Sequence, residues 1–164
     1  MASRIYSIDA SSLLKLKQDF PRKVFPAVWE KIEQLVREGR LIAPEEVHHE
    51  LENDDLLEHW AKQRKAMFRK MTQEIWEVAE EVARRFPALA KPGKFGPAAD
   101  PFVVAVAKVE NQNRSRTLYD DPPECIVVTE EGGGPHQIPA ACSAFGVQYV
   151  NLVGLFQLEE WEFR

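Results

Sequence analysis

Four acidic residues follow predicted strands or lie on the helices beside them: Asp9, Glu50, Asp100 and Glu131. Asp9 comes directly after the short apolar run Ile5–Ile8, and Glu131 comes after the apolar run Cys125–Thr129. The carboxyl ends of parallel strands meet at one edge of a sheet, where open α/β folds build their sites. We therefore expect the four carboxylates to lie close together at that edge.

Several carboxylates gathered in one place imply a cation. They repel one another strongly unless a positive charge joins them. Mg²⁺ and Mn²⁺ prefer oxygen ligands, keep several waters and need only a few carboxylates. Such a site activates a bound water and holds a phosphodiester for in-line attack. The pattern therefore indicates metal-dependent hydrolysis of a phosphodiester.

The same acids also have a purely structural interpretation. Asp9 and Asp100 each stand where the N-cap of a helix belongs, and Pro101 occupies the favoured first helical position. Glu50 lies three residues after Val47, beside the buried face of its helix, and can point inward. Both roles are compatible with the local sequences, and the convergence of the four acids favours the catalytic one.

Other catalytic chemistries fit the sequence less well. Ser11 and Ser12 have no Gly-x-Ser-x-Gly setting, and Ser11 also stands where a phosphoryl-aspartate mechanism would need a second aspartate. The histidines do not form a His-Glu-x-x-His zinc motif. For His48 and His49 we expect a solvated helix face.

The elements that must position the acids alternate along the chain. Apolar runs of strand type occupy residues 5–8, 41–43, 125–129 and 147–150. Helical spacing or helix signals mark residues 10–14, 27–38, 45–52, 100–110, 138–145 and 152–158, with a mixed stretch at 15–25. Gly39 and Gly146 end two helices, and Asn151 can cap the last. The alternation predicts an α/β fold with a mostly parallel central sheet.

The segment Asp54–Phe86 is predicted to form two helices, separated near Met71–Thr72. Lys62, Lys65 and Arg69 then fall on one face of the first helix. That face is either simply solvated or a contact strip for phosphates. A loop rich in Gly and Pro occupies residues 87–97, and a polar stretch occupies residues 111–124.

Composition narrows the class of protein. The 164 residues suit a single domain, and the formal net charge of -5 argues against coating nucleic acid by bulk charge. A local basic patch beside a metal stays compatible with that charge. Cys125 and Cys142 are expected to be reduced and buried. No apolar run is long enough to span a membrane, and residues 1–9 lack a signal-peptide core, so we expect a cytoplasmic protein.

Four segments together resemble the PIN-domain family: Ile8–Leu14, Val47–Leu51, Ala99–Ala107 and Val127–Glu131. The chain is most similar to the DUF4411 group, a PIN-like subfamily of bacterial proteins. That group shares the Ala-Asp-Pro-Phe helix start, the Thr-x-Glu strand end and the later Ile-Pro helix seen here at Ile138–Pro139. The resemblance spans nearly the whole chain and rests on the order and spacing of short motifs.

The resemblance implies a PIN-like three-layer α/β/α sandwich over residues 1–164 and a ribonuclease that uses Mg²⁺ or Mn²⁺. By motif position, Asp9 and Asp100 are direct metal ligands, and Glu50 is a ligand or orients the metal-bound water. Ser11 stands where many members have Asn and is expected to form hydrogen bonds near the metal.

The last acidic position departs from the family pattern. Glu131 stands where many PIN domains have Asp, so Glu130 is an alternative ligand. Thr129 is expected to donate a hydrogen bond to a neighbouring carboxylate or to the first strand.

The expected function is a metal-dependent endoribonuclease, the toxin of a toxin–antitoxin pair. Its expected partners are an RNA substrate, a protein antitoxin and a second copy of the chain, with no membrane. The alternative is a non-catalytic PIN-like module that binds nucleic acid or protein. The negative net charge and the glutamate at position 131 favour that alternative.

Overall fold

The computed structural model describes residues 4–91, 98–115 and 123–164. The strands are β1 (Ile5–Ile8), β2 (Leu41–Pro44), β3 (Phe68–Arg69), β4 (Cys125–Val128) and β5 (Tyr149–Val150). The helices are α1 (Ala10–Asp19), α2 (Pro26–Arg37), α3 (Glu45–Glu50), α4 (Asp55–Lys62), α5 (Gln73–Arg85), α6 (Asp100–Ser115), α7 (Ile138–Phe145) and α8 (Leu152–Leu158). Short 3₁₀ turns occupy Leu51–Asn53, Lys65–Met67 and Pro87–Ala90.

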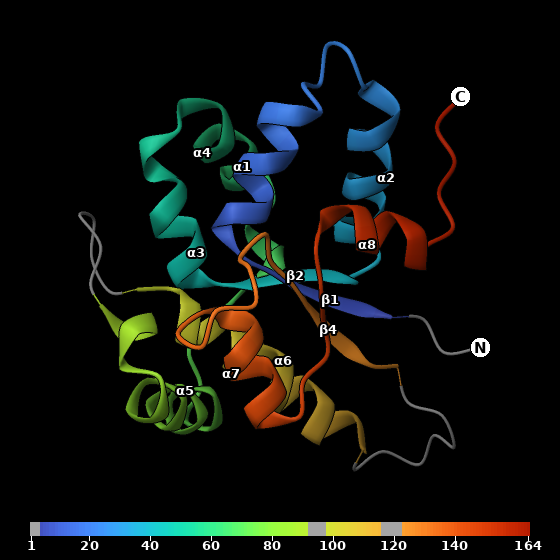
Figure 1. Cartoon of the computed structure of the whole chain (residues 1–164). Coiled ribbons are helices and arrows are strands. Elements are labelled where there is room, and N and C mark those ends of the chain that lie inside the picture. The colour runs from blue at the N-terminus through green and yellow to red at the C-terminus, as the bar shows by residue number, and fades with distance from the viewer. Residues whose placement is uncertain (1–3, 92–97, 116–122) are drawn as a thin grey trace.

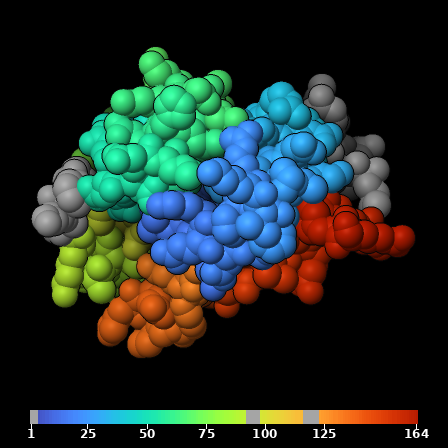
Figure 2. Space-filling view, turned by 90° about the horizontal axis from the view of Figure 1, so that it is seen from above, coloured from blue at the N-terminus to red at the C-terminus, as the bar shows by residue number. Residues whose placement is uncertain are grey.

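The strands form one parallel sheet in the order β3-β2-β1-β4-β5. Helices α1, α2, α3, α4 and α8 lie on one side of it, and α5, α6 and α7 lie on the other (Figure 1). Seen from above, α1, α2, α3 and α4 build a continuous cover with α8 at its side (Figure 2). This confirms the predicted α/β class and its three layers.

The central strands are buried on both faces, as a parallel sheet requires. Every residue of β1, β2 and β4 is buried, and β1 pairs along its whole length with Cys125–Val128. The pairing continues past β1, since the backbone N–H of Asp9 donates to the carbonyl of Val128 at 3.0 Å. Asp9 is therefore fixed at the carboxyl end of the central strand.

Helix α6 is the main buried helix beneath the sheet. Its core-facing side is made of small and β-branched residues: Val103, Val104, Ala105, Val106, Ala107 and Val109. The Ser7 hydroxyl on β1 donates to the carbonyl of Val103 at 2.9 Å and ties the helix to the central strand. Because α6 begins beneath the carboxyl edge of the sheet, its first residue, Asp100, lies at that edge.

The structure confirms the predicted helix ends at Gly39 and Gly146 and the predicted start at Asn151. Gly39 and Gly146 have φ of 71° and 69°, the left-handed conformation that favours glycine at a helix end. The side chain of Asn151 caps α8, accepting from Gly154 N at 2.8 Å. Cys125 and Cys142 are free and buried, as expected.

The first helix is longer than expected, since α1 continues to Asp19 through the stretch interpreted as mixed. The last strand is shorter and spans only Tyr149–Val150. The polar stretch after residue 110 begins as helix, because α6 extends to Ser115. Residues 92–97 of the Gly- and Pro-rich loop and residues 116–122 of the polar stretch lie outside the described residues.

The prediction of two long helices over 54–86 is wrong in its first half. Helix α4 ends at Lys62, and the chain then forms the turn Lys65–Met67 and the edge strand β3. Lys62, Lys65 and Arg69 therefore do not share a helix face. Lys62 pairs with Glu58 at 3.0 Å, and Arg69 pairs across the fold with Glu110 at 3.5 Å. The break near Met71–Thr72 is correct, because Thr72 caps α5.

A compact ion-pair network lies at the amino end of the sheet. Arg40, just before β2, binds both oxygens of Glu159 at 2.7 and 2.6 Å. The fully buried Tyr6 donates its hydroxyl to Glu159 at 2.5 Å, and Arg40 Nε donates to the carbonyl of Arg4 at 2.8 Å. The segment after α8 is thereby fastened to the first two strands.

None of the helices in the described ranges has the length and apolar character needed to cross a bilayer.

Candidate active site

The structure brings the four predicted acids to one open cavity of about 350 Å³. Asp9 follows β1, Glu50 ends α3, Asp100 begins α6 and Glu131 lies just beyond β4. Four separate elements thus deliver one carboxylate each to the carboxyl edge of the sheet.

Asp9 is held by a dense set of donors. It receives hydrogen bonds from Ser12 N at 2.9 Å, from the Ser11 hydroxyl at 2.8 Å and from the Thr129 hydroxyl at 2.5 Å. Its exposed fraction is only 2%. Burial raises the pKa of Asp9, and the hydrogen bonds from Thr129, Ser12 and Ser11 act against that rise. Asp9 therefore caps α1, which confirms the structural interpretation, and it lines the cavity at the same time.

Glu50 joins the cavity to the start of α6. Its Oε1 accepts a hydrogen bond from Ala99 N at 2.9 Å. Burial raises its pKa, the Ala99 N–H lowers it, and the charges of Asp9 and Glu131 raise it further. The bond places Glu50 directly beside the residue that precedes Asp100.

Asp100 is the first residue of α6 and not its N-cap, which corrects the expected position by one residue. Pro101 is correspondingly the second helical residue. The pKa of the Asp100 carboxyl is raised to about 8, first by burial and then by the charges of Glu131, Glu50 and Asp9. A hydrogen bond to the Glu131 carboxyl adds to this rise. Asp100 is thus where the crowding of negative charge is most severe.

The two adjacent glutamates after β4 have different surroundings. Glu131 lines the cavity, and its Oε2 accepts from Ile138 N at 2.7 Å at the start of α7. Glu130 instead accepts from Leu152 N at 2.8 Å at the start of α8 and is not among the cavity's lining residues. Of the two, Glu131 is the one brought to the other acids.

Ser11 and Thr129 form the bridge between the first strand and the end of β4. Besides binding Asp9, the Ser11 hydroxyl accepts from Glu130 N at 3.2 Å, and the Thr129 hydroxyl accepts from Glu131 N at 3.1 Å. The expected hydrogen bond from Thr129 to a neighbouring carboxylate is confirmed. The two hydroxyls fix where the chain turns after β4.

The remaining predicted polar residues lie elsewhere. His49 is exposed, as expected, whereas His48 is half-buried and stacks on Phe68 at 4.7 Å between ring centroids. Lys91 lines the carboxylate cavity and was not predicted. Nothing in the local sequence distinguishes it from other lysines.

The donor set suits a hard, hydrated cation. All four side chains offer carboxylate oxygens, the ligands that Mg²⁺ and Mn²⁺ prefer. Within residues 4–91, 98–115 and 123–164, no three His, Cys, Asp or Glu side chains are arranged to hold a metal ion as they lie. Mg²⁺ commonly needs only one or two protein carboxylates besides several waters, and this donor set is compatible with that ion.

Of the comparisons with known proteins, the one with family models identifies a family. A family model described as "Domain of unknown function (DUF4411)" matches residues 6–163, and the chain belongs to this family. No curated protein and no solved structure matches the chain.

Proposed function

We propose that this member of the DUF4411 family is a Mg²⁺- or Mn²⁺-dependent endoribonuclease with a PIN-like site. One observation carries the proposal: four carboxylates from four elements line a single open cavity at the carboxyl edge of a parallel sheet. Burial, together with the charges of the neighbouring carboxylates, raises the pKa of Asp100 and Glu50 there, and a divalent cation is a group that relieves such repulsion.

The four acids have two roles in this proposal. Asp9 and Asp100 are the direct ligands. Asp9 is held in place by three hydrogen-bond donors, and Asp100 is the acid whose negative charge burial and its neighbours disfavour most. Glu50 and Glu131 each have one oxygen engaged by a backbone N–H, which leaves the other to orient water. A bound cation supplies the remaining chemistry, by activating that water and neutralising the phosphodiester.

The role as a toxin rests on the motif resemblance to PIN-like toxins. It implies a protein antitoxin encoded beside this chain, and the expected result is that the antitoxin suppresses RNA cleavage. A cleavage assay with and without the purified product of the neighbouring gene tests this part separately.

The proposal is tested by incubating a mixed RNA substrate with the protein and Mn²⁺, with EDTA, and with the Asp100→Asn variant. The expected result is cleavage only with Mn²⁺ and intact Asp100. Glu130→Gln is the matched control, because this neighbouring acid accepts from Leu152 N at the start of α8 and lies outside the cavity lining. Loss of cleavage in Asp100→Asn but not in Glu130→Gln supports the site, whereas cleavage insensitive to EDTA and to Asp100→Asn contradicts it.

A second candidate is a non-catalytic PIN-like binding module. The observation that favours it is the hydrogen bond from Ile138 N to Glu131, which engages this longer carboxylate in a structural role. It predicts binding of RNA or a protein with no cleavage in any metal, and binding unchanged by Asp100→Asn.

A further inference from the structure

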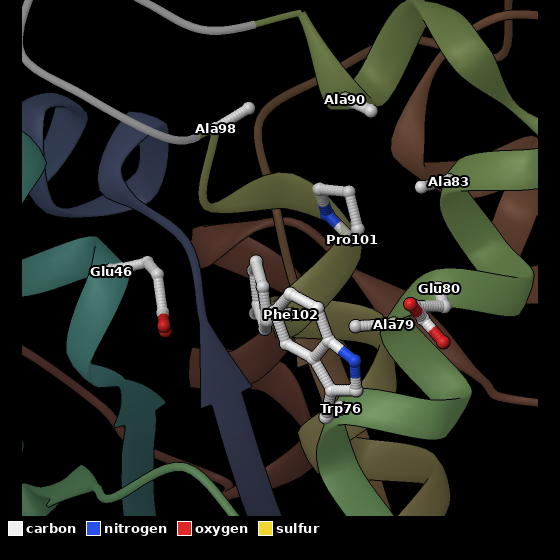
Figure 3. Close-up of a pocket in the computed structure, with 9 residues that line it drawn as sticks. All are labelled: Glu46, Trp76, Ala79, Glu80, Ala83, Ala90, Ala98, Pro101 and Phe102. Carbon is white, nitrogen blue, oxygen red and sulfur yellow. The ribbon is translucent and has the colours of Figure 1, made fainter.

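An apolar groove of about 290 Å³ lies beside the carboxylate cavity, between α3, α5 and the start of α6. Ala98 lines both spaces, so the groove and the cavity share a wall. Small side chains, among them Ala79, Ala83 and Ala90, leave the groove open. Figure 3 shows the rings of Trp76 and Phe102 between Glu46 on one side and Glu80 on the other.

Helices α3 and α6 contribute residues to both the groove and the carboxylate cavity. Glu46 precedes Glu50 by four residues on α3, which is about one helical turn, or roughly 5.4 Å along the axis. Phe102 follows Asp100 by two residues on α6. A ligand that reaches from the acids into the groove therefore needs to extend by only about one turn of helix.

The groove has an aromatic wall that the fold does not need for its core. Trp76 is 45% exposed, although α5 buries Ile75, Ala79 and Val82. Its ring centroid lies 6.1 Å from that of Phe102, with 40° between the planes. A large exposed ring next to a hollow is typical of surfaces that stack flat ligands. Trp76 is thus a large apolar side chain that α5 does not bury with Ile75, Ala79 and Val82.

We propose that this groove binds a nucleobase of the RNA, next to the phosphodiester held at the acids, with Trp76 as the stacking residue. The inference rests on the proposed ribonuclease function and adds a base subsite to it. Aromatic side chains stack on unpaired bases in single-stranded RNA.

The two glutamates at the groove favour entry of the base over the phosphate and favour some bases over others. Glu46 and Glu80 repel phosphate, so the base and not the backbone enters. Their carboxylates accept hydrogen bonds only, and the exocyclic amino groups of adenine, cytosine and guanine are donors. Uracil has no exocyclic amino group. The groove should therefore prefer amino-bearing bases over uracil.

The size of the groove also favours one flat group over a protein helix. Its volume is at the lower end of the range for small-molecule pockets, about 300–1,000 Å³. A docked helix would need a row of apolar anchors over two turns. A single base fits the space between the two rings and the alanines.

The test uses the non-cleaving Asp100→Asn protein with Mg²⁺ and fluorescein-labelled eight-nucleotide oligo(A) or oligo(U). Fluorescence anisotropy reports the affinity. We expect oligo(A) to bind more tightly, and Trp76→Ala to weaken oligo(A) binding by about 5–100-fold, the usual effect of losing one base stack. Trp76→Phe should retain most of the affinity. Glu46→Gln, which adds an amide donor, should narrow the difference between oligo(A) and oligo(U).

Tyr149→Ala is the matched control, because Tyr149 is 44% exposed but lies on β5, the opposite edge of the sheet. Thermal unfolding of each variant confirms that it is folded. The base subsite is overturned if Asp100→Asn binds oligo(A) equally well with and without Trp76→Ala, or if oligo(A) is not preferred over oligo(U). In either case, RNA cleavage by the wild-type protein still supports the proposed function. Absence of both wild-type cleavage and RNA binding overturns the proposed function, and this inference with it.

Discussion

The two ends of the same parallel sheet treat charge in opposite ways. At the amino end, Glu159 is surrounded by Arg40 and the Tyr6 hydroxyl, so its charge is fully paired. At the carboxyl end, four acids face one cavity, and Lys91 is the cation among that cavity's described lining residues. The paired charges at the amino end are typical of a structural contact. The gathered acids at the carboxyl end are typical of a site that binds a ligand of opposite charge.

Under the proposed function, the carboxyl end is where the protein gives up stability for activity. Crowded, half-buried carboxylates destabilise a folded chain, and stabilising replacements at such sites commonly cost activity. The contrast predicts opposite signs: removing Glu159 at the amino end should destabilise the protein, and removing the charge of Asp100 at the carboxyl end should stabilise it.

The largest effect is expected from Glu159→Ala. This change leaves Arg40 and the buried Tyr6 hydroxyl without their shared partner, and breaking a buried pair from one side costs about 3–5 kcal/mol. Urea denaturation followed by circular dichroism measures the loss. Glu38→Ala is the control, because Glu38 lies 3.6 Å from Arg40 at the surface and should cost about 0–1 kcal/mol. Equal losses in both variants would show that the network is not a structural contact of this kind.

The next effect is a pH dependence of the metal-free protein. The pKa of Asp100 is about 8 in the folded state, above its ordinary value of 3.8, so between these values the folded state holds the extra proton. The free energy of unfolding therefore falls as the pH rises, by about 3–4 kcal/mol between pH 5 and pH 8. Thermal unfolding in EDTA measures it. Mn²⁺ should remove most of the fall, and a pH slope unchanged by Mn²⁺ contradicts the assignment.

Asp100→Asn should remove this fall and stabilise the metal-free protein at pH 8 by about 3 kcal/mol, since it removes a charge that burial and three neighbours disfavour. Denaturant midpoints at pH 5 and pH 8 measure the gain, which should nearly vanish at pH 5. Destabilisation at pH 8 would mean that the charge of Asp100 is stabilised by the fold, as that of Glu159 is, and would contradict the contrast between the two ends.

The smallest change in stability is expected from Thr129→Val. The variant removes the hydroxyl that binds Asp9 at 2.5 Å but leaves the donors Ser11 and Ser12 N, so the cost should be about 1 kcal/mol. Its effect on Mn²⁺ affinity should be larger, about tenfold, as is usual for residues that orient a ligand. Calorimetric titration measures this, and Thr129→Ser should restore the affinity. Unchanged Mn²⁺ affinity in Thr129→Val would argue against Asp9 as a ligand.

The sequence carries enough signal for the central strands and most helix ends, because those depend on local patterns. The runs before Asp9 and Glu131 are continuous and apolar, and Gly39 and Gly146 end their helices by a backbone conformation that glycine favours. Strand β3 escaped prediction because its two residues lie inside the segment Asp54–Phe86, for which helices are predicted. Phe68 pairs with Ala43 on β2, and no pattern within the segment itself encodes that neighbour.

The choice between Glu130 and Glu131 also lay beyond local reasoning. Each glutamate is bound by a backbone N–H at the start of a different helix, 22 residues away for Glu130 and 7 for Glu131. Those helix starts come together only in the folded protein. The identity of the acids could be predicted from the sequence, whereas the direction in which each side chain points depends on tertiary packing.

The bond between Thr129 and Asp9 also has a consequence in time. The two residues are 120 positions apart in the chain, so at about 5–20 residues per second a ribosome makes Asp9 about 6–24 s before Thr129. Throughout that interval β1 lacks its neighbour β4, and the carboxylate cavity does not exist. Until Thr129 has been made, the growing chain therefore cannot form the bond that fixes Asp9 at the end of β4.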